Sequence, residues 1–265
     1  MSSLQNLSHL SFTDRHIHLV PDVVLKPIAD GCLSLQHMDL GACMFNDEDI
    51  RYFLTKKQTQ LSSFRSKLCL SFESYKCLTQ CKNLEHLHLD TLGHSSNNAS
   101  SNIKLLRNLT NLKTLMLNDL TKEEFRAVPR LFVRGHLSNV TKLGYIAYDL
   151  RTVVKNCPQL LELTVRGTKH VLEGGFKHIG NCKNLRCLSL SGSSEVTAKC
   201  LEYVAADISD SGFTGNNFHL IPSHLVHLRE LVIYACRVND EVWDRLLKKM
   251  PHLKLTGRYV VGDDD

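Results

Sequence analysis

One nine-residue pattern recurs along this chain and restricts what it can fold into. The clearest copies are residues 81–89, Cys-Lys-Asn-Leu-Glu-His-Leu-His-Leu, and residues 182–190, Cys-Lys-Asn-Leu-Arg-Cys-Leu-Ser-Leu. Their shared frame is an apolar residue or Cys, a Leu three positions later, and a Leu-x-Leu step that begins three positions after that. Further copies occupy residues 4–12, 32–40, 109–117, 140–148, 157–165, 225–233 and 247–255. A degenerate copy, with Arg65 in an apolar position, ends at Leu70.

The frame predicts the structure of each unit. Side chains alternate between the two faces of a strand, so the Leu-x-Leu step predicts a short strand with both leucines directed inward. Between these steps apolar residues recur at helical spacing, as in Ile50, Phe53 and Leu54. A unit of one strand and one helix cannot bury its apolar face alone, so the units must stack.

The spacing of the units identifies the repeat class. The ten units have a mean spacing of about 27 residues, inside the range of leucine-rich repeats. We therefore predict an α/β leucine-rich-repeat solenoid, with a curved parallel β ladder on the concave side and helices on the convex side. We expect a single domain of about ten irregular units over residues 1–262, followed by an acidic tail at 263–265. The polar residues 92–102 and 207–217 are interpreted as surface loops.

Capping signals place several of the helices. Acidic residues follow Asn46 and precede Ile50, which predicts a helix that begins there. Thr121-x-x-Glu124 is a capping box. Residues 196–204 and 240–247 have the same helical pattern.

The repeat also accounts for six of the ten cysteines. Cys32, Cys81, Cys157 and Cys182 fill the first position of the frame, and Cys43 and Cys236 lie three positions after the last strand residue. We predict that these six thiols are small apolar core residues, since buried Cys behaves in that way.

Two segments carry a family resemblance. Residues 156–165, Asn-Cys-Pro-Gln-Leu-Leu-Glu-Leu-Thr-Val, resemble the Cys-Pro-x-Leu-x-x-Leu register of cysteine-containing leucine-rich repeats. Residues 233–240, Ile-Tyr-Ala-Cys-Arg-Val-Asn-Asp, are similar to the strand end and capped helix of that subtype. The subtype is typical of leucine-rich-repeat F-box proteins and of relatives without an F-box. The resemblance covers nearly the whole chain and is clearest over residues 140–255.

The resemblance implies substrate recognition for an SCF-type (cullin) ubiquitin ligase, in ubiquitin-dependent protein degradation. That class joins the ligase through a separate F-box segment, and no such segment is found before Leu4. The alternative is a ligase-independent scaffold or inhibitor. We also expect the apolar residues of the first unit to be frayed, or covered by a capping partner or ligase adaptor subunit.

The residues that flank the strand leucines should point outward on the concave face and contact a protein partner. The predicted protein-binding residues are His37, Asp39, His86, His88, Asp90, Met116, Asn118, Tyr145, Asp149, Glu162, Arg166, Glu230 and Tyr234. Acids, histidines and aromatic residues are mixed in this set, which suits a protein better than a phosphate backbone.

Two chemical alternatives arise from the same face. His9, His37, His86 and His88 suggest a metal site or a pH-sensitive contact, but no further ligands stand at zinc-type spacing. Cys69 and Cys187 fall on predicted concave positions and leave a thiol enzyme as a remote alternative. The sequence has no recognisable nucleophile motif and no Gly-rich phosphate loop. We therefore predict a non-enzymatic protein without catalytic residues, metal or cofactor.

Charge and hydropathy exclude other partner classes. Lys and Arg number 32 and Asp and Glu 27, without a basic block, so a nucleic-acid-binding stripe is not indicated. The first residues lack the pattern of a secretory signal, and no apolar run is long enough to span a membrane. We therefore expect a soluble cytoplasmic protein, with the nucleus as a second location.

Overall fold

The computed structural model describes residues 4–12, 24–67, 70–90, 99–118, 120, 122–146, 150–166, 177–191, 225–234 and 240–256. They belong to two compact units, residues 1–140 and residues 141–265. Each unit is a parallel strand ladder with helices on one side.

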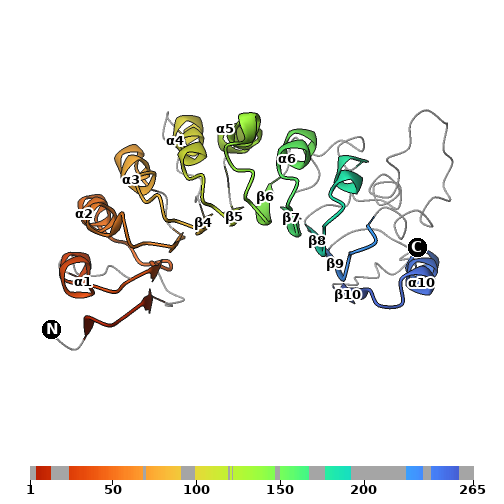
Figure 1. The fold of residues 1–265 in the computed structure, drawn as a ribbon, viewed down its shortest axis with the longest axis horizontal. Coiled ribbons are helices and arrows are strands. Elements are labelled where there is room, and N and C mark those ends of the chain that lie inside the picture. The colour runs from red at the N-terminus through yellow and green to blue at the C-terminus, as the bar shows by residue number, and fades with distance from the viewer. Residues whose placement is uncertain are drawn as a thin grey trace, which may run out of the picture. The chain divides into compact units, whose positions relative to one another are not determined.

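Unit 1 contains a ladder in which the strands follow one another in chain order. Each strand pairs in parallel with the next. The strands are β1 (His9–Ser11), β2 (His37–Asp39), β3 (Ser63–Ser66), β4 (His86–Asp90) and β5 (Thr114–Asn118). The helices are α1 (Leu25–Gly31), α2 (Asp47–Lys57), α3 (Phe72–Leu78), α4 (Ala99–Leu105) and α5 (Lys122–Ala127), with short 3₁₀ turns η2 (Leu106–Asn108), η3 (Val128–Leu131) and η4 (Val133–Gly135). Within this unit the helices lie on the outer side of the ladder (Figure 1).

Unit 2 repeats the arrangement. Its strands are β6 (Lys142–Ile146), β7 (Glu162–Arg166), β8 (Cys187–Ser191), β9 (Glu230–Tyr234) and β10 (Lys254–Thr256), each parallel to the next. Its described helices are α6 (Leu150–Asn156), η6 (Lys177–Asn181) and α10 (Asp240–Lys249). The predicted parallel ladder with helices beside it is thus confirmed in both units.

The core consists of the apolar residues of the frame. In the repeat that contains β4, Leu84, Leu87 and Leu89 are at most 1% exposed, and the corresponding leucines of the repeats that contain β5 and β8 are equally buried. Cys32, Cys43, Cys81, Cys157 and Cys182 are buried as predicted. Burial raises the pKa of the Cys81, Cys157 and Cys182 thiols to about 12, so they remain protonated core residues.

Two strands begin at a different place from the one the frame predicts. In β3 the inward residues are Phe64 and Ser66, which pair with Leu87 and Leu89 of β4. The predicted unit that ended at Leu70 lies four residues too far along the chain. Arg65 therefore does not occupy an apolar position but lies between two inward residues, on the outward side of β3.

The second difference concerns β6. Leu143 and Tyr145 pair with the inward residues Leu163 and Val165, and both are fully buried. The predicted frame, which placed Ile146 where Leu143 lies, was three residues late. An odd shift exchanges the two faces of a strand. Tyr145 was therefore wrongly predicted to lie on the concave face.

The helix signals are confirmed wherever the structure describes them. Helix α2 begins at Asp47, and the Asn46 side chain accepts a hydrogen bond from the Glu48 N–H at 2.9 Å. Helix α10 begins at Asp240. The predicted polar loop over 92–102 was wrong at residues 99–102, because α4 begins at Ala99 and buries Asn102.

Some predictions fall outside the described residues. They are the capping residue Thr121, the helix over 196–204, the loop over 207–217, Cys69, Cys236 and the tail at 263–265. Among the helices that the structure describes, none combines the length and the apolar character that crossing a membrane requires.

Candidate functional site

The outward side chains of the unit 1 ladder form lateral rows, because parallel pairing aligns equivalent positions of successive strands. The first row contains His9, His37, Ser63, His86 and Thr114. The second row contains Ser11, Asp39, Arg65, His88 and Met116, and Asp90 pairs with Asn118 beyond it. We call this set of rows the strand face of unit 1. Neighbouring residues of a row lie about 4.8 Å apart, the spacing of paired strands.

The first row brings three histidines together. The rings of His9 and His37 are stacked, with centroids 3.8 Å apart and an interplanar angle of 9°. Burial, together with the positive charge of His9 and His86, lowers the pKa of His37 below its ordinary value. Nδ1 of His86 lies 3.0 Å from the hydroxyl oxygen of Thr114. The lowered pKa favours the neutral form of His37.

The second row pairs a carboxylate with a guanidinium. Nη1 of Arg65 lies 3.8 Å from Oδ2 of Asp39. The other carboxylate oxygen, Oδ1, accepts a hydrogen bond from the Gly41 N–H at 2.8 Å. Asp39 is thus held in place by backbone, and Arg65 retains an accessible surface with 40% of its side chain exposed.

His88, Asp90 and Asn118 form a compact polar cluster at the carboxyl end of β4 and β5. Nε2 of His88 lies 3.1 Å from Oδ1 of Asp90, and the Asn118 amide nitrogen donates to the same oxygen. Burial tends to raise the pKa of Asp90. The hydrogen bonds from His88 and Asn118 outweigh it, with help from the charges of His88 and Arg65, so the pKa lies below its ordinary value. The cluster therefore holds a fixed negative charge.

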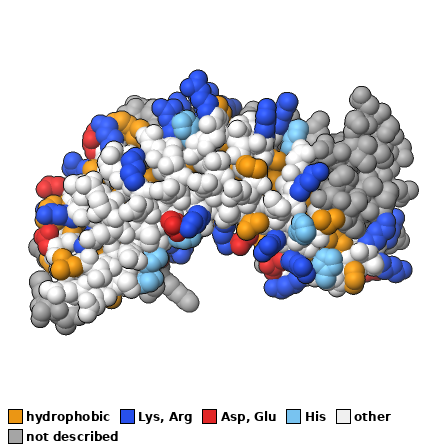
Figure 2. Space-filling model, viewed as in Figure 1, with side chains coloured by type: hydrophobic (Ala, Val, Ile, Leu, Met, Phe, Trp, Pro, Cys, Tyr) orange, Lys and Arg blue, Asp and Glu red, His pale blue; other side chains and the backbone are white. Residues whose placement is uncertain are grey.

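The strand face of unit 2 has a first row of alternating charge. In strand order it contains Lys142, Glu162, Cys187, Glu230 and Lys254. Lys142 Nζ pairs with Glu162 at 2.5 Å, and Lys254 Nζ pairs with Glu230 at 2.8 Å. Acidic and basic side chains also stand side by side elsewhere on the surface in view (Figure 2). A face of this kind carries a pattern of charges rather than a field of one sign.

Cys187 lies at the centre of this row. Its sulfur is 3.8 Å from Oε2 of Glu230. Burial raises the pKa of the Cys187 thiol, and the negative charges of Glu230 and Glu162 raise it further, while Lys142 opposes them. A raised pKa leaves little thiolate at neutral pH, which disfavours Cys187 as a nucleophile.

Most of the predicted binding residues occupy these rows. His37, Asp39, His86, His88, Met116, Glu162, Arg166 and Glu230 lie on outward strand positions and are at least partly accessible, and Asp90 belongs to the polar cluster. Asn118 is in the same cluster but is only 6% exposed, so it positions Asp90. Tyr234 occupies an outward register position opposite Ser191, and Asp149 lies outside the described residues.

Sequence reasoning missed two charged residues of the strand faces, Arg65 and Lys142. Arg65 was assigned to an apolar position, and Lys142 was left out because the β6 frame was late. The sequence did contain a signal for each. Leu61 and Phe64 have the three-residue spacing of the frame and would have placed Arg65 outward. Leu137 and Val140 have the same spacing and would have placed Lys142 outward.

The histidines of the first row do not assemble into a metal site. Within the described ranges no group of three His, Cys, Asp or Glu side chains is arranged to hold a metal ion. His9, His37 and His86 follow one another along a row and meet their neighbours through ring stacking and a hydroxyl.

Solved structures resemble the fold at low sequence identity. The internalin InlF of Listeria monocytogenes matches 97% of this chain and 76% of its own, with a TM-score of 0.51 and 13% identity. A chain of the yeast Rad7–Elc1 complex matches 88% of this chain and 70% of its own, with a TM-score of 0.49 and 15% identity. No protein-family model matches the chain.

The likeness to the internalin concerns the fold alone. It agrees with the parallel ladders, the strand–helix units and the buried frame leucines described above. Together these observations establish that the chain is a leucine-rich-repeat protein with an α/β solenoid fold.

Proposed function

We propose that this chain is a protein-binding solenoid and that the two strand faces contact the partner. The observation that carries this proposal is the ordered polar row on each face. In unit 2 the charges run positive, negative, thiol, negative, positive across five strands. A preformed face of this kind loses little backbone entropy on binding, because strand pairing already fixes the backbone from which its side chains project.

The chemistry of the faces defines the kind of partner. Lys142 and Glu162, like Glu230 and Lys254, are ion pairs within the face, so a partner meets both signs of charge close together. Unit 1 adds Arg65 and the partly exposed histidines. Such a surface matches a polar protein surface with complementary charges, and charge complementarity gives specificity more than affinity.

Binding without catalysis is part of the proposal. Cys187 is the thiol on the described strand faces, and its pKa is raised by burial and by two carboxylates. The leucine-rich-repeat fold itself supports an interaction role, since solenoids present extended binding surfaces.

We further propose a specific role for this protein binding, which is substrate recognition for an SCF-type ubiquitin ligase. It is supported by the resemblance of residues 156–165 and 233–240 to the repeats of F-box proteins. The alternative, a ligase-independent scaffold or inhibitor, uses the same faces and differs only in the proteins that assemble with the chain.

The test compares a strand-face variant with a matched helix-side variant. The strand-face variant, R65S/H86S, replaces both side chains by serine. Serine is compatible with an outward position of the ladder, because Ser63 already occupies one in the first row. The control, K56S/K76S, changes two side chains that are about half exposed on α2 and α3. Tagged wild type and both variants are purified from native cells, and co-purifying proteins are quantified by mass spectrometry.

The proposal predicts a protein whose recovery falls at least fivefold with R65S/H86S and stays within twofold of wild type with K56S/K76S. Equal recovery with all three chains contradicts the strand-face proposal. Cullin and adaptor subunits among the recovered proteins support the ligase assignment. A partner sensitive to the strand face without those subunits favours the scaffold or inhibitor.

A further inference from the structure

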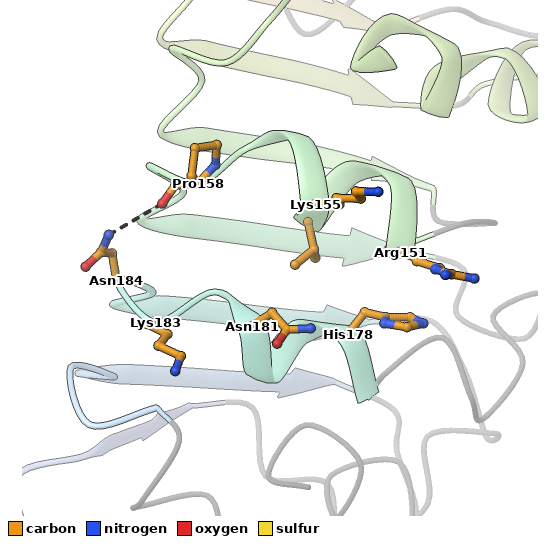
Figure 3. A pocket seen from close by; sticks show the side chains of 8 residues that line it. Arg151, Lys155, Pro158, His178, Asn181, Lys183 and Asn184 are labelled. Carbon is orange, nitrogen blue, oxygen red and sulfur yellow. Dashed lines mark hydrogen bonds between the residues drawn. The ribbon is translucent and has the colours of Figure 1, made fainter. Parts of the chain in front are cut away.

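A basic pocket lies on the helix side of unit 2, away from the rows that carry the proposed function. It opens between α6 and η6 and has a volume of about 560 Å³. Arg151 and Lys155 of α6 line it from one side, and His178 and Asn181 of η6 line it from the other (Figure 3). Lys183, in the turn after η6, completes the set of basic side chains.

Within the part of the chain that the structure describes, no acidic residue lines this pocket. Arg151, Lys155 and Lys183 are exposed, and no acidic side chain of the described ranges forms an ion pair with any of them. By contrast, Lys142 and Lys254 on the strand face of the same unit each pair with a glutamate. Cations gathered in a concave site without counter-charges raise the local potential and attract anions.

The frame of the pocket is built into the repeats. Val154 is 6% exposed, and it anchors the helix that carries Arg151 and Lys155. The Asn184 amide donates to the Pro158 carbonyl at 3.4 Å, which ties the two turns at one end of the pocket (Figure 3). The basic side chains thus project from α6, from η6 and from the turn after η6, and the hydrogen bond from Asn184 to Pro158 joins the two neighbouring repeats.

We propose that this pocket binds a phosphate group, either carried on a phosphorylated protein segment or as a free polyphosphate anion. Arg offers a planar fork of donors that fits phosphate oxygens, and Lys adds point charges. The Asn181 amide supplies a further polar group in the lining. A phosphate monoester carries about two negative charges at neutral pH, which the three cations of the pocket can neutralise.

The site is too small to be a nucleic-acid-binding surface. Proteins that bind a nucleic-acid backbone typically neutralise about 6–10 phosphates along an extended stripe. Here Arg151, Lys155 and Lys183 gather around one pocket between two neighbouring repeats. A single phosphate, or a short run of them, matches that arrangement.

The test measures binding of inorganic pyrophosphate, and of a phosphoserine peptide with its unphosphorylated twin, by isothermal titration calorimetry on the full chain. The variant R151Q/K155Q removes two exposed pocket cations. The matched control, K248Q/K249Q, removes two exposed lysines of α10, so the net charge changes equally. Circular dichroism establishes that both variants remain folded.

We expect wild type to bind at least one phosphate probe saturably and R151Q/K155Q to bind it at least tenfold more weakly. That factor corresponds to losing about one charge-assisted hydrogen bond. The control should stay within about twofold, since its lysines lie outside the pocket. Tighter binding of the phosphopeptide identifies a phosphoprotein as the source, and tighter binding of pyrophosphate identifies a free anion. No saturable binding of either phosphate probe, or equal weakening in both variants, would overturn the proposal. Equal affinity for the two peptides would overturn it unless pyrophosphate binds more tightly than both.

Discussion

Gly41 is a single residue on which the turn after β2 depends. Its φ angle is +56°, in the left-handed region that disfavours residues with a side chain. A Cβ atom there would lie 1.9 Å from the backbone oxygen of Phe12, too close to be accommodated without movement of the backbone. The Gly41 N–H also donates to Asp39, so the turn fixes one charge of the strand face.

Replacing Gly41 by alanine should destabilise the protein by about 1–3 kcal/mol, the cost of a strained backbone conformation. The matched control is G31A, at the end of α1, where nothing lies within 4 Å of the position that the new methyl group would take. That change should be neutral or stabilise by up to about 1 kcal/mol, because alanine restricts the unfolded chain. Urea unfolding of both variants measures the difference, and equal effects would contradict the steric argument.

Asp90 links stability to pH. Its pKa is lowered in the folded protein, so its carboxylate contributes stability above the ordinary carboxyl pKa of about 3.9. That contribution is lost as the pH falls through the folded-state pKa. D90N should therefore cost about 1–2 kcal/mol at pH 7, where charged hydrogen bonds from His88 and Asn118 are removed.

The difference in the free energy of unfolding between wild type and D90N should shrink as the pH falls below the ordinary carboxyl pKa, as measured by urea unfolding at neutral and at acid pH. The control is D244N, because Asp244 is exposed on α10, where a substitution should change stability by less than about 0.5 kcal/mol. A difference for D90N that stays constant with pH would show that the carboxylate charge is not its cause.

Between elements, a ladder of asparagines connects successive repeats. The side-chain nitrogens of Asn83, Asn111 and Asn139 each donate to a backbone carbonyl of the preceding repeat, at 2.7, 2.8 and 3.2 Å. Asn184 makes the corresponding bond in unit 2. Each asparagine directly precedes the second apolar residue of the frame. The amides thus satisfy carbonyls at the turns that begin the strands.

Asn111→Ala should destabilise unit 1 by about 1 kcal/mol, the net contribution of one hydrogen bond. Asn108→Ala serves as its control, since Asn108 is exposed and its side chain bonds to none of the described residues. Thermal or urea unfolding should place the control within about 0.5 kcal/mol of wild type. Equal losses for the two variants would mean that the ladder adds no stability.

For the whole molecule, the single domain over residues 1–262 stays a prediction. Repeats of a solenoid are coupled through contacts with their neighbours, so we expect one cooperative unfolding transition. Trp243, the single tryptophan of the sequence, lies in α10 of unit 2 and reports on that unit. Its fluorescence and far-ultraviolet circular dichroism should give the same urea midpoint, and two separate midpoints would contradict a single domain.

The sequence by itself determined the repeat, its class and most of its core. The frame leucines and five of the buried cysteines were assigned correctly, because a short apolar period of this kind allows one arrangement of strand and helix. Most residues of the strand faces followed from the same alternation. The N-cap of α2 could also be predicted from the sequence, since the hydrogen bond from the Glu48 N–H to the Asn46 side chain lies within one helical turn.

Only the tertiary structure decided the register of β3 and β6 and what lies between repeats. Tyr145 and Ile146 both suit a strand, and the choice between them depends on which one fits opposite Val165 in the neighbouring strand. Arg65 likewise became an outward residue only once Phe64 was paired with Leu87. The basic pocket joins residues of two elements separated along the chain. A local sequence pattern shows the periodicity of a strand or helix. The register of a strand and the grouping of charged side chains depend on contacts between residues far apart in the chain, which a local pattern does not contain.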